Sequence, residues 1–457
     1  MSVPSNFLTA TETVALVKSG ALTVTQVALD HLARYDARDP TIHAWAYLNR
    51  DLILSEAKRL DAIPPEERGP LHGVMLGVKD MIHTKDMPTQ HNSPIYIDHH
   101  PHVDAGPVAV CRAAGALIYG KTHTTEFAST IVGPPARNAW DPRRTPGGSS
   151  SGSGAAVGDW QCHFAFGTQT GGSTIRPGSY NGIFAMKPTW GAISREGLKI
   201  YSVTLDTLGL YARSVADLQL LCKVFQLADD IPPPTVPKPL SESTFAYIKT
   251  DQWDARDGPS PELLAAWDKS KALLVAAGAK VIDVDLPAEF DRIQGHRNIH
   301  IMNGEGRVNF LAEYMIGKDK MHESLVGHVE NTKNITRRQQ LDAYDTVAAL
   351  RPVFDKIASQ YDAVITPSVP AQAPMGIEST GDARFCGMWT ALHVPCVNVP
   401  GFASDEGAPI GLTLIGPRYE DERLLSVSSQ VAKAWLNADK EKYLPFAAPA
   451  GVEHSTA

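Results

Sequence analysis

Apolar and polar residues alternate along this chain with two different periods. Over residues 24–34 the apolar positions recur at the spacing of one helix face, and the whole segment before residue 60 has this helical character. Residues 109–115 also have a helical pattern, and they lead into a short apolar run at 116–119 that is typical of a buried strand. An earlier apolar run, residues 73–78, ends abruptly at Lys79 and Asp80.

The second half of the chain repeats the alternation of strand and helix patterns. Helices are predicted at 261–277, 339–360 and 421–436, and strands at 245–248, 280–284, 363–366 and 411–415. Interleaved strands and helices are typical of a sheet covered by helices on both faces. The predicted fold class is therefore α/β, a single large domain with a central twisted, mixed and mostly parallel β-sheet.

Within this fold we expect three segments. Residues 1–60 form N-terminal helices that pack on the core, residues 61–440 form the α/β domain, and residues 441–457 form a C-terminal tail. A proline-rich stretch marks a surface loop at about 229–243. Strand and helix patterns resume beyond it in the same style, which favours one continuous sheet over two domains.

Composition narrows the range of partners. The net charge of −8 is not accompanied by any lysine- or arginine-rich block, which argues against a nucleic-acid or anionic-membrane partner. Five scattered cysteines fit reduced, buried thiols better than a disulfide framework. No signal peptide and no stretch long enough to span a bilayer is evident, so a soluble cytoplasmic protein is expected.

Three pattern matches suggest other chemistries and fit poorly. Residues 115–122 match the P-loop pattern, but the residues between its glycines are themselves a predicted strand, which leaves no flexible phosphate-binding turn. Residues 148–152 match the G-x-S-x-G elbow with Ser150 at its centre, yet no strand precedes them. Four histidines lie in a proline-containing loop without metal-ligand spacing, which favours surface histidines: His91, His99, His100 and His102.

Two glycine- and serine-rich segments carry the more specific signal. They span 145–155 and 167–177 and are separated by an apolar stretch, which is not typical of a flexible linker. Successive glycines let backbone N–H groups point at one ligand, as an oxyanion hole requires. A serine nucleophile also needs a base. Lys79 could supply one if burial keeps its amine neutral, and the alternative is an ordinary solvated or ion-paired lysine.

With these motifs the chain resembles the amidase signature family. The resemblance extends over nearly the whole chain in the expected order, at 77–80, 114–128, 147–152, 167–173, 187–194, 206–215 and 395–416. It implies the family's fold, amide C–N hydrolysis through a seryl acyl-enzyme, and no metal or organic cofactor. It also implies that Ser173 is the nucleophile, Ser149 the relay after a cis Gly148–Ser149 bond, and Lys79 the base.

The same resemblance suggests roles for the neighbouring residues. Backbone N–H groups of Thr170, Gly171 and Gly172 are expected to form the oxyanion hole. Ser150 and Thr168 are expected to support the relay by hydrogen bonds.

Residues near Ser173 suggest several possible substrate classes. Arg176, three residues after Ser173, resembles the malonamidase-type branch, where it would grip a substrate carboxylate, and the alternative is a structural arginine. Gln169 and Trp389 are further candidates for substrate contact, and the far wall of the pocket is expected from 294–313 and 385–393. Neutral or aryl amides, esters and carbamates stay open as substrates. So do a glutamine-using amidotransferase subunit, a non-catalytic binding protein and a homodimer.

Overall fold

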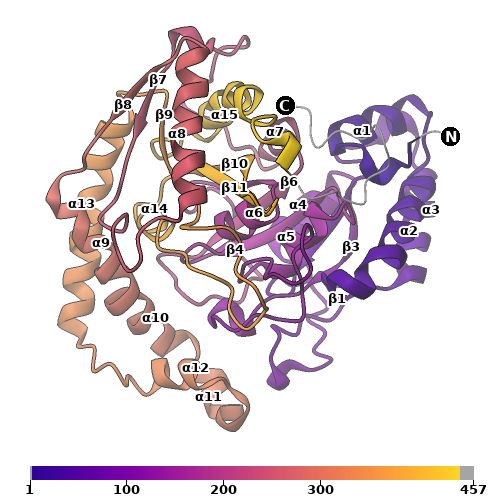
Figure 1. The fold of residues 1–457 in the computed structure, drawn as a ribbon. Coiled ribbons are helices and arrows are strands. Elements are labelled where there is room, and N and C mark those ends of the chain that lie inside the picture. Colours follow the sequence, from indigo (N-terminus) through magenta and orange to yellow (C-terminus); the bar gives the residue numbers. More distant parts are fainter. Residues whose placement is uncertain (1–2, 443–457) are drawn as a thin grey trace.

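The computed structural model describes residues 3–442 and contains one sheet of eleven strands. Figure 1 shows the sheet running through the middle of the molecule with helices on both sides. The order of the strands across the sheet is β1-β3-β2-β4-β6-β5-β10-β11-β9-β7-β8. Their bounds are β1 (Trp45–Tyr47), β2 (Met75–Lys79), β3 (Leu117–Thr122), β4 (Phe164–Gln169), β5 (Phe184–Lys187), β6 (Thr207–Ala212), β7 (Thr244–Tyr247), β8 (Lys280–Asp283), β9 (Ala363–Pro367), β10 (Cys396–Ala403) and β11 (Pro409–Ile415).

Helices precede, connect and follow these strands. Those of the first half are α1 (Ala10–Ser19), α2 (Val24–Ile42), α3 (Arg50–Asp61), α4 (Gly106–Ala113), α5 (Ser151–Gly158), α6 (Ile175–Tyr180) and α7 (Val215–Val224). Those of the second half are α8 (Pro261–Ala276), α9 (Arg292–Gly295), α10 (Met302–Asn309), α11 (Leu311–Gly317), α12 (Glu323–Val329), α13 (Arg337–Ala358), α14 (Gly387–Ala391) and α15 (Asp421–Trp435). A π-helix, His296–Ile301, joins α9 to α10.

The single mixed α/β domain was predicted correctly, but the mostly parallel sheet was not. Six of the ten neighbouring strand pairs are antiparallel, and the parallel pairs lie toward the two ends of the sheet. The reason lies in the connections. β5 joins β6 and β10 joins β11 without a crossover helix, and strands joined in that way pair in opposite directions.

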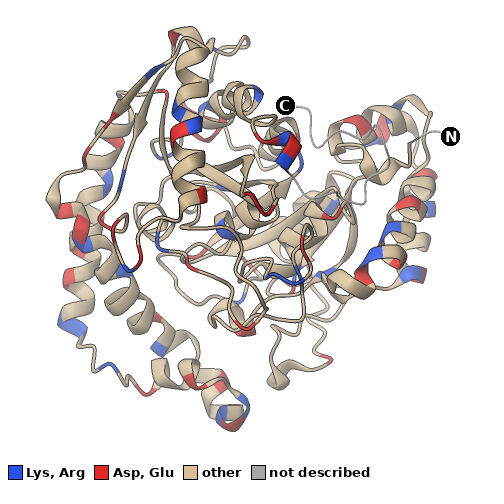
Figure 2. Cartoon of the chain, in the orientation of Figure 1, with Lys and Arg blue, Asp and Glu red and all other residues tan. Residues whose placement is uncertain are grey.

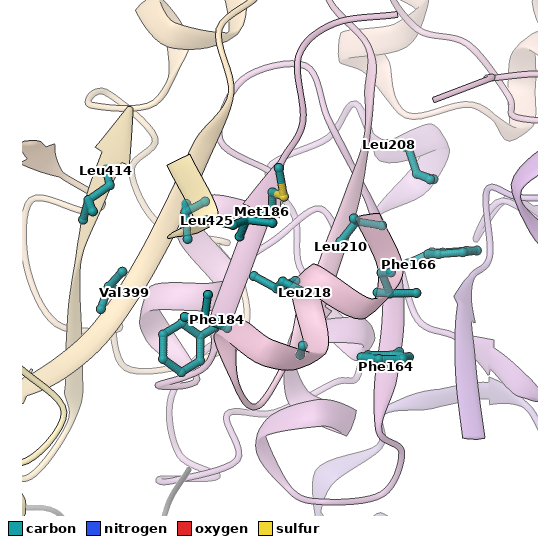
Figure 3. Packing of buried hydrophobic residues seen from close by; sticks show 14 of the residues in the cluster. Phe164, Phe166, Phe184, Met186, Leu208, Leu210, Leu218, Val399, Leu414 and Leu425 are labelled. Carbon is teal, nitrogen blue, oxygen red and sulfur yellow. The ribbon is translucent and has the colours of Figure 1, made fainter. Parts of the chain in front are cut away.

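One face of the sheet packs on α7 and α15 through large apolar side chains. Figure 3 shows Phe164 and Phe166 of β4 on one side of Leu210 of β6, Phe184 and Met186 of β5 on its other side, and Leu218 of α7 among them. All of these side chains are buried. The next residues along each strand point to the other face, where small side chains let α5 and α6 approach closely. These two helices begin directly after the glycine- and serine-rich loops.

The predicted elements are confirmed within a few residues at 24–34, 245–248, 280–284, 363–366 and 411–415. The N-terminal helices α1–α3 lie together at one edge of the molecule, beside β1 and β3 (Figure 1). All five cysteines are free and buried, as expected. Most of the predicted tail, residues 441–457, lies outside the described residues.

Charged residues of both signs are interspersed along the outer helices (Figure 2). None of the helices in residues 3–442 combines the length and the apolar character needed to cross a membrane. Lys79, Lys121 and Lys187 are instead fully buried on strands of the sheet, and Lys79 belongs to the site described next.

Candidate active site

The two glycine- and serine-rich loops meet at the starts of α5 and α6. Ser149 and Ser150 directly precede α5, and Ser173 lies two residues before α6. The backbone N–H of Ser150 donates to the carbonyl oxygen of Ser173 at 3.4 Å, which ties the loops together. The Gly148–Ser149 peptide bond is cis, as the resemblance implied.

Lys79 ends β2 with its side chain fully buried beneath the two loops. Its Nζ lies 2.8 Å from Ser149 Oγ, 2.9 Å from Ser150 Oγ and 2.7 Å from Thr168 Oγ1. The amine is therefore surrounded by three hydroxyl groups. Within residues 3–442, no carboxylate lies within the 4.0 Å of an ion pair.

Burial lowers the pKa of Lys79 well below its ordinary value of 10.5. The negative charge of Asp206 acts weakly in the other direction. Asp206 is itself buried, and loss of hydration raises its pKa to about 6. Its carboxylate accepts hydrogen bonds from the Thr170 hydroxyl at 2.5 Å and from the Tyr201 amide at 2.7 Å.

Lys121, at the corresponding end of the neighbouring strand β3, provides a contrast. It is equally buried, but its Nζ lies 3.3 Å from Asp80 Oδ1. The same amine donates to the carbonyl oxygen of Ile82 at 2.8 Å and to Thr89 Oγ1 at 2.6 Å. Lys121 therefore stabilises a loop. The P-loop pattern around it is the strand β3, as the sequence indicated.

The segment between β4 and α6 is held by side chains on both sides. Gln169 Oε1 accepts from the amides of Thr174 at 2.9 Å and Ile175 at 3.0 Å, and its Nε2 donates to Thr390 Oγ1 at 3.0 Å. Thr390 Oγ1 in turn donates to the carbonyl oxygen of Gly171 at 2.9 Å. These bonds give Gln169 the role of shaping the loop.

The amide groups of residues 171–173 donate to no acceptor in the described part of the chain. The N–H groups of Gly171 and Gly172, two of the three residues predicted for this role, and that of Ser173 itself form the arrangement that an oxyanion hole requires. The Tyr211 hydroxyl donates to the carbonyl oxygen of Ser173 at 3.2 Å and so fixes the far side of that residue.

Arg176 is occupied by the protein itself. Its Nε and Nη2 donate to the carbonyl oxygen of Gly148 at 3.2 and 2.5 Å, and Nη1 donates to that of Gly381 at 2.6 Å. Nη2 also donates to Thr380 Oγ1 at 3.1 Å. The guanidinium thus holds the residue before Ser149 in place, and the geometry gives it a structural role.

Trp389 is buried on α14 and packs against Phe354 of α13, with 5.3 Å between ring centroids. Both expected wall segments contain residues that approach the loop after β4: Thr390 from 385–393, and Arg297 from 294–313, whose Nη1 donates to the carbonyl oxygen of Thr170 at 3.1 Å. Arg297 was not predicted from the sequence. Asp206 lay within a quoted motif, but no role was assigned to it.

The four histidines at positions 91–102 do not form a metal site in the described residues, where no group of three metal-binding side chains occurs. One detail of that expectation was wrong. His91 is buried, and its backbone carbonyl accepts from the amide of Phe127, so it belongs to the packed interior.

Known proteins match this chain over most of its length. The Amidase family profile matches residues 26–425. A glutamyl-tRNA(Gln) amidotransferase subunit of Streptomyces avermitilis is 30% identical over 94% of this chain and 95% of its own length. The corresponding subunit of Acidothermus cellulolyticus is also 30% identical, over 93% and 94% of the two chains.

Solved structures give the same result. A crystal structure of an amidase is 28% identical with a TM-score of 0.81 and covers 93% of this chain and 99% of its own. A fatty acid amide hydrolase, at 22% identity, shares the fold with a TM-score of 0.84 over 94% and 85% of the two chains. The chain therefore belongs to the amidase family, the amidase signature family that its sequence resembles, and is an enzyme acting on amide C–N bonds.

Proposed function

We propose that the protein cleaves small carboxylic acid amides by acyl transfer to Ser173, with Ser149 as the proton relay and Lys79 as the base. The observation that carries this proposal is the environment of the Lys79 amine. It is fully buried, contacts three hydroxyl groups, and has no carboxylate beside it among residues 3–442. Such an environment favours a neutral amine, which can accept a proton.

The hydrogen bonds around Lys79 are compatible with transfer of the Ser149 proton to the amine. A neutral amine has two N–H groups and one lone pair, so one of its three hydroxyl neighbours donates to it. The Ser150 hydroxyl has another acceptor, the carbonyl oxygen of Thr168 at 3.3 Å. Ser149 Oγ and Thr168 Oγ1 have no other partner in the described residues, so the proton of either hydroxyl is free to point at Nζ, and the proposed relay uses that of Ser149.

In the proposed reaction Ser173 Oγ attacks the amide carbonyl carbon. Its proton passes to Ser149 Oγ while the Ser149 proton moves to Lys79 Nζ. The amides of residues 171–173 stabilise the oxyanion. The proton on Lys79 then returns through Ser149 to the leaving nitrogen as the C–N bond breaks. Water releases the acyl group by the same steps in reverse.

A second candidate is supported by the relatives. Those reported above are named as amidotransferase subunits, and they align with this chain over almost its full length. In that role the protein would use glutamine as the amide and pass the released ammonia to a partner chain. The acyl-transfer chemistry at Ser173 is the same in both candidates, and they differ in the substrate and in the fate of the nitrogen.

The malonamidase-like branch stays a prediction, and its original basis is weaker. Arg176, which suggested that branch, already donates four hydrogen bonds to the protein. Esters and carbamates also remain candidate substrates because attack by Ser173 does not depend on the leaving atom.

The test is a panel of amides supplied to the purified chain. It contains malonamate, glutamine, a neutral aliphatic amide, an aryl amide and an aryl carbamate, each run beside Ser173→Ala. We expect turnover of at least one compound and a loss of about 10³-fold or more in the variant. Unchanged rates in Ser173→Ala would refute the proposal, and turnover of glutamine alone would favour the amidotransferase role. No turnover of any compound would favour a binding protein.

A further inference from the structure

One buried arginine beside the proposed active site has an unusual position. Arg297 lies in the π-helix His296–Ile301, and its side chain is directed at the loop that follows β4. The residue is only 4% exposed. Its Nη1 donates to the carbonyl oxygen of Thr170 at 3.1 Å, three residues before Ser173. Single turns of π-helix occur frequently at functional sites.

The charge of Arg297 has no counter-ion among residues 3–442. Its Nη2 donates to the side chain of Asn298, Nη1 also lies 3.2 Å from Met302 Sδ, and Nε has no partner. No carboxylate lies within 4.0 Å in the part of the chain that the structure describes. Burial lowers its pKa to about 10, so the group stays protonated at neutral pH.

Two of the other four buried arginines in the described residues pair with a carboxylate, and the other two, Arg176 and Arg213, donate to backbone carbonyl oxygens. Arg34 pairs with Asp159 at 2.9 Å, and Arg144 pairs with Asp141 at 3.1 Å. Arg176 has no carboxylate, but the protein engages each of its three nitrogens. Leaving a buried cation unpaired carries a large free-energy cost. A ligand anion would remove that cost at Arg297.

Two glycines let the backbone pack closely against the guanidinium. A Cβ at Gly387 would lie 2.5 Å from Arg297 Nε and 2.6 Å from Gln294 Oε1, and a Cβ at Gly171 would lie 3.1 Å from Nη1. Gln294 Oε1 also has no hydrogen-bond partner. Unpaired polar atoms therefore meet at the start of α14, next to the loop that carries Ser173.

We propose that Arg297 binds a carboxylate on the acyl part of the substrate. This inference rests on the proposed function and narrows its substrates to amides that also carry a carboxylate, a class that includes glutamine and the half-amides of dicarboxylic acids. A planar guanidinium is suited to recognition of a carboxylate, and the Nε of Arg297 has no hydrogen-bond partner in the described residues. Arg297 thus takes the role that the sequence assigned to Arg176.

The experiment compares substrates that differ only in the charged group: malonamate with malonamide, and succinamate with succinamide. The enzymes are the wild type, Arg297→Gln and Arg297→Lys. We expect Arg297→Gln to lower kcat/KM for the acid amides by about 100-fold or more, mainly through KM, and to change the neutral amides less than about threefold. Arg297→Lys should lie between the two because it keeps the charge and loses the planar fork.

Arg351→Gln is the matched control. This arginine is half-buried and donates through Nε to the carbonyl oxygen of Ala391, with no carboxylate within 4.0 Å in the described residues. It lines a separate cavity of about 410 Å³ with Trp190 and His393. We expect this variant to affect acid and neutral amides equally. A charge-selective loss in Arg351→Gln, or an equal loss for both substrate types in a folded Arg297→Gln, would overturn the proposal.

A measurement on the wild type covers the case in which the variants do not fold. Malonate, succinate and glutarate are tested as inhibitors of the neutral amide or, if it is not turned over, as ligands that raise the Tm. At least one is expected to compete or to stabilise, and no effect from any of them would refute the carboxylate site. These outcomes differ from failure of the proposed function, in which Ser173→Ala keeps its activity whatever the charge of the substrate.

Discussion

Ser150 holds the amine of Lys79 in position. Substitution of Ser150 is therefore the most direct single test of how the base is held. Ser150 Oγ lies 2.9 Å from Lys79 Nζ, accepts from the backbone N–H of Thr168 at 3.2 Å, and donates to the carbonyl oxygen of Thr168 at 3.3 Å. Ser150→Ala removes all three contacts without adding bulk. It leaves the buried Thr168 N–H without an acceptor and gives the Lys79 amine one neighbour fewer.

The size of the effect follows from these contacts. An unsatisfied buried donor costs about 1–3 kcal/mol, so the free energy of unfolding should fall by about that amount. Loss of one contact that orients the base should raise the activation barrier by about 1.4–2.8 kcal/mol, which is a 10- to 100-fold fall in kcat. Denaturant unfolding and steady-state kinetics on whichever amide is turned over measure the two quantities separately.

Ser151→Ala is the control, because Ser151 is the next residue and equally buried, and its hydroxyl has no partner in the described residues. We expect its kcat to stay within about threefold of the wild type, since no hydrogen bond is lost. Equal kcat values for Ser150→Ala and Ser151→Ala would refute the reasoning, since they would show that the base does not depend on its hydroxyl neighbours.

Further predictions concern the pH dependence of kcat/KM and the effect of substitutions at Arg176. In the proposed mechanism Lys79 acts as a neutral base, and burial lowers its pKa, so kcat/KM for a neutral amide should rise with pH and level off below pH 10.5. Asp206→Asn removes a negative charge that raises the pKa of Lys79, so the rising limb should move to lower pH; a shift to higher pH would contradict this. Arg176→Met should reduce the free energy of unfolding by about 2–4 kcal/mol in denaturant titrations, because the carbonyl of Gly148 loses its donors. Arg176→Lys should leave the preference between acidic and neutral amides unchanged, and a KM increase confined to acidic amides would restore Arg176 as the carboxylate anchor.

Much of the fold was predictable because local patterns matched the final elements. The apolar run that ends at Lys79 is β2, and the helical pattern from residue 24 is α2. The direction of the central strands was not predictable in the same way. It depends on which strands pair across the sheet, and the alternation of helix and strand patterns does not report that when some connections lack a helix.

In the candidate site, too, features set by nearby residues were predictable and features set by distant residues were not. Short motifs indicated Ser149 and Ser173 because their spacing is local, and the family resemblance implied the cis Gly148–Ser149 bond that the structure contains. The partners of Arg176 lie about thirty residues before it and about two hundred after it, so its occupation by backbone carbonyls could not be read from its own segment. Arg297 lies in an irregular π-helical turn with no apolar period and no motif, which left no signal to find it.

The most direct test of the central claim is to locate the acyl group on the enzyme. The protein is mixed briefly with an activated ester, quenched in acid and digested, and the modified residue is identified by fragmentation mass spectrometry. The account predicts an acyl group on Ser173, strongly reduced in Lys79→Ala and absent from Ser173→Ala. Acylation of Ser149 or Ser150 in the wild type, or labelling that survives in Ser173→Ala, would contradict it.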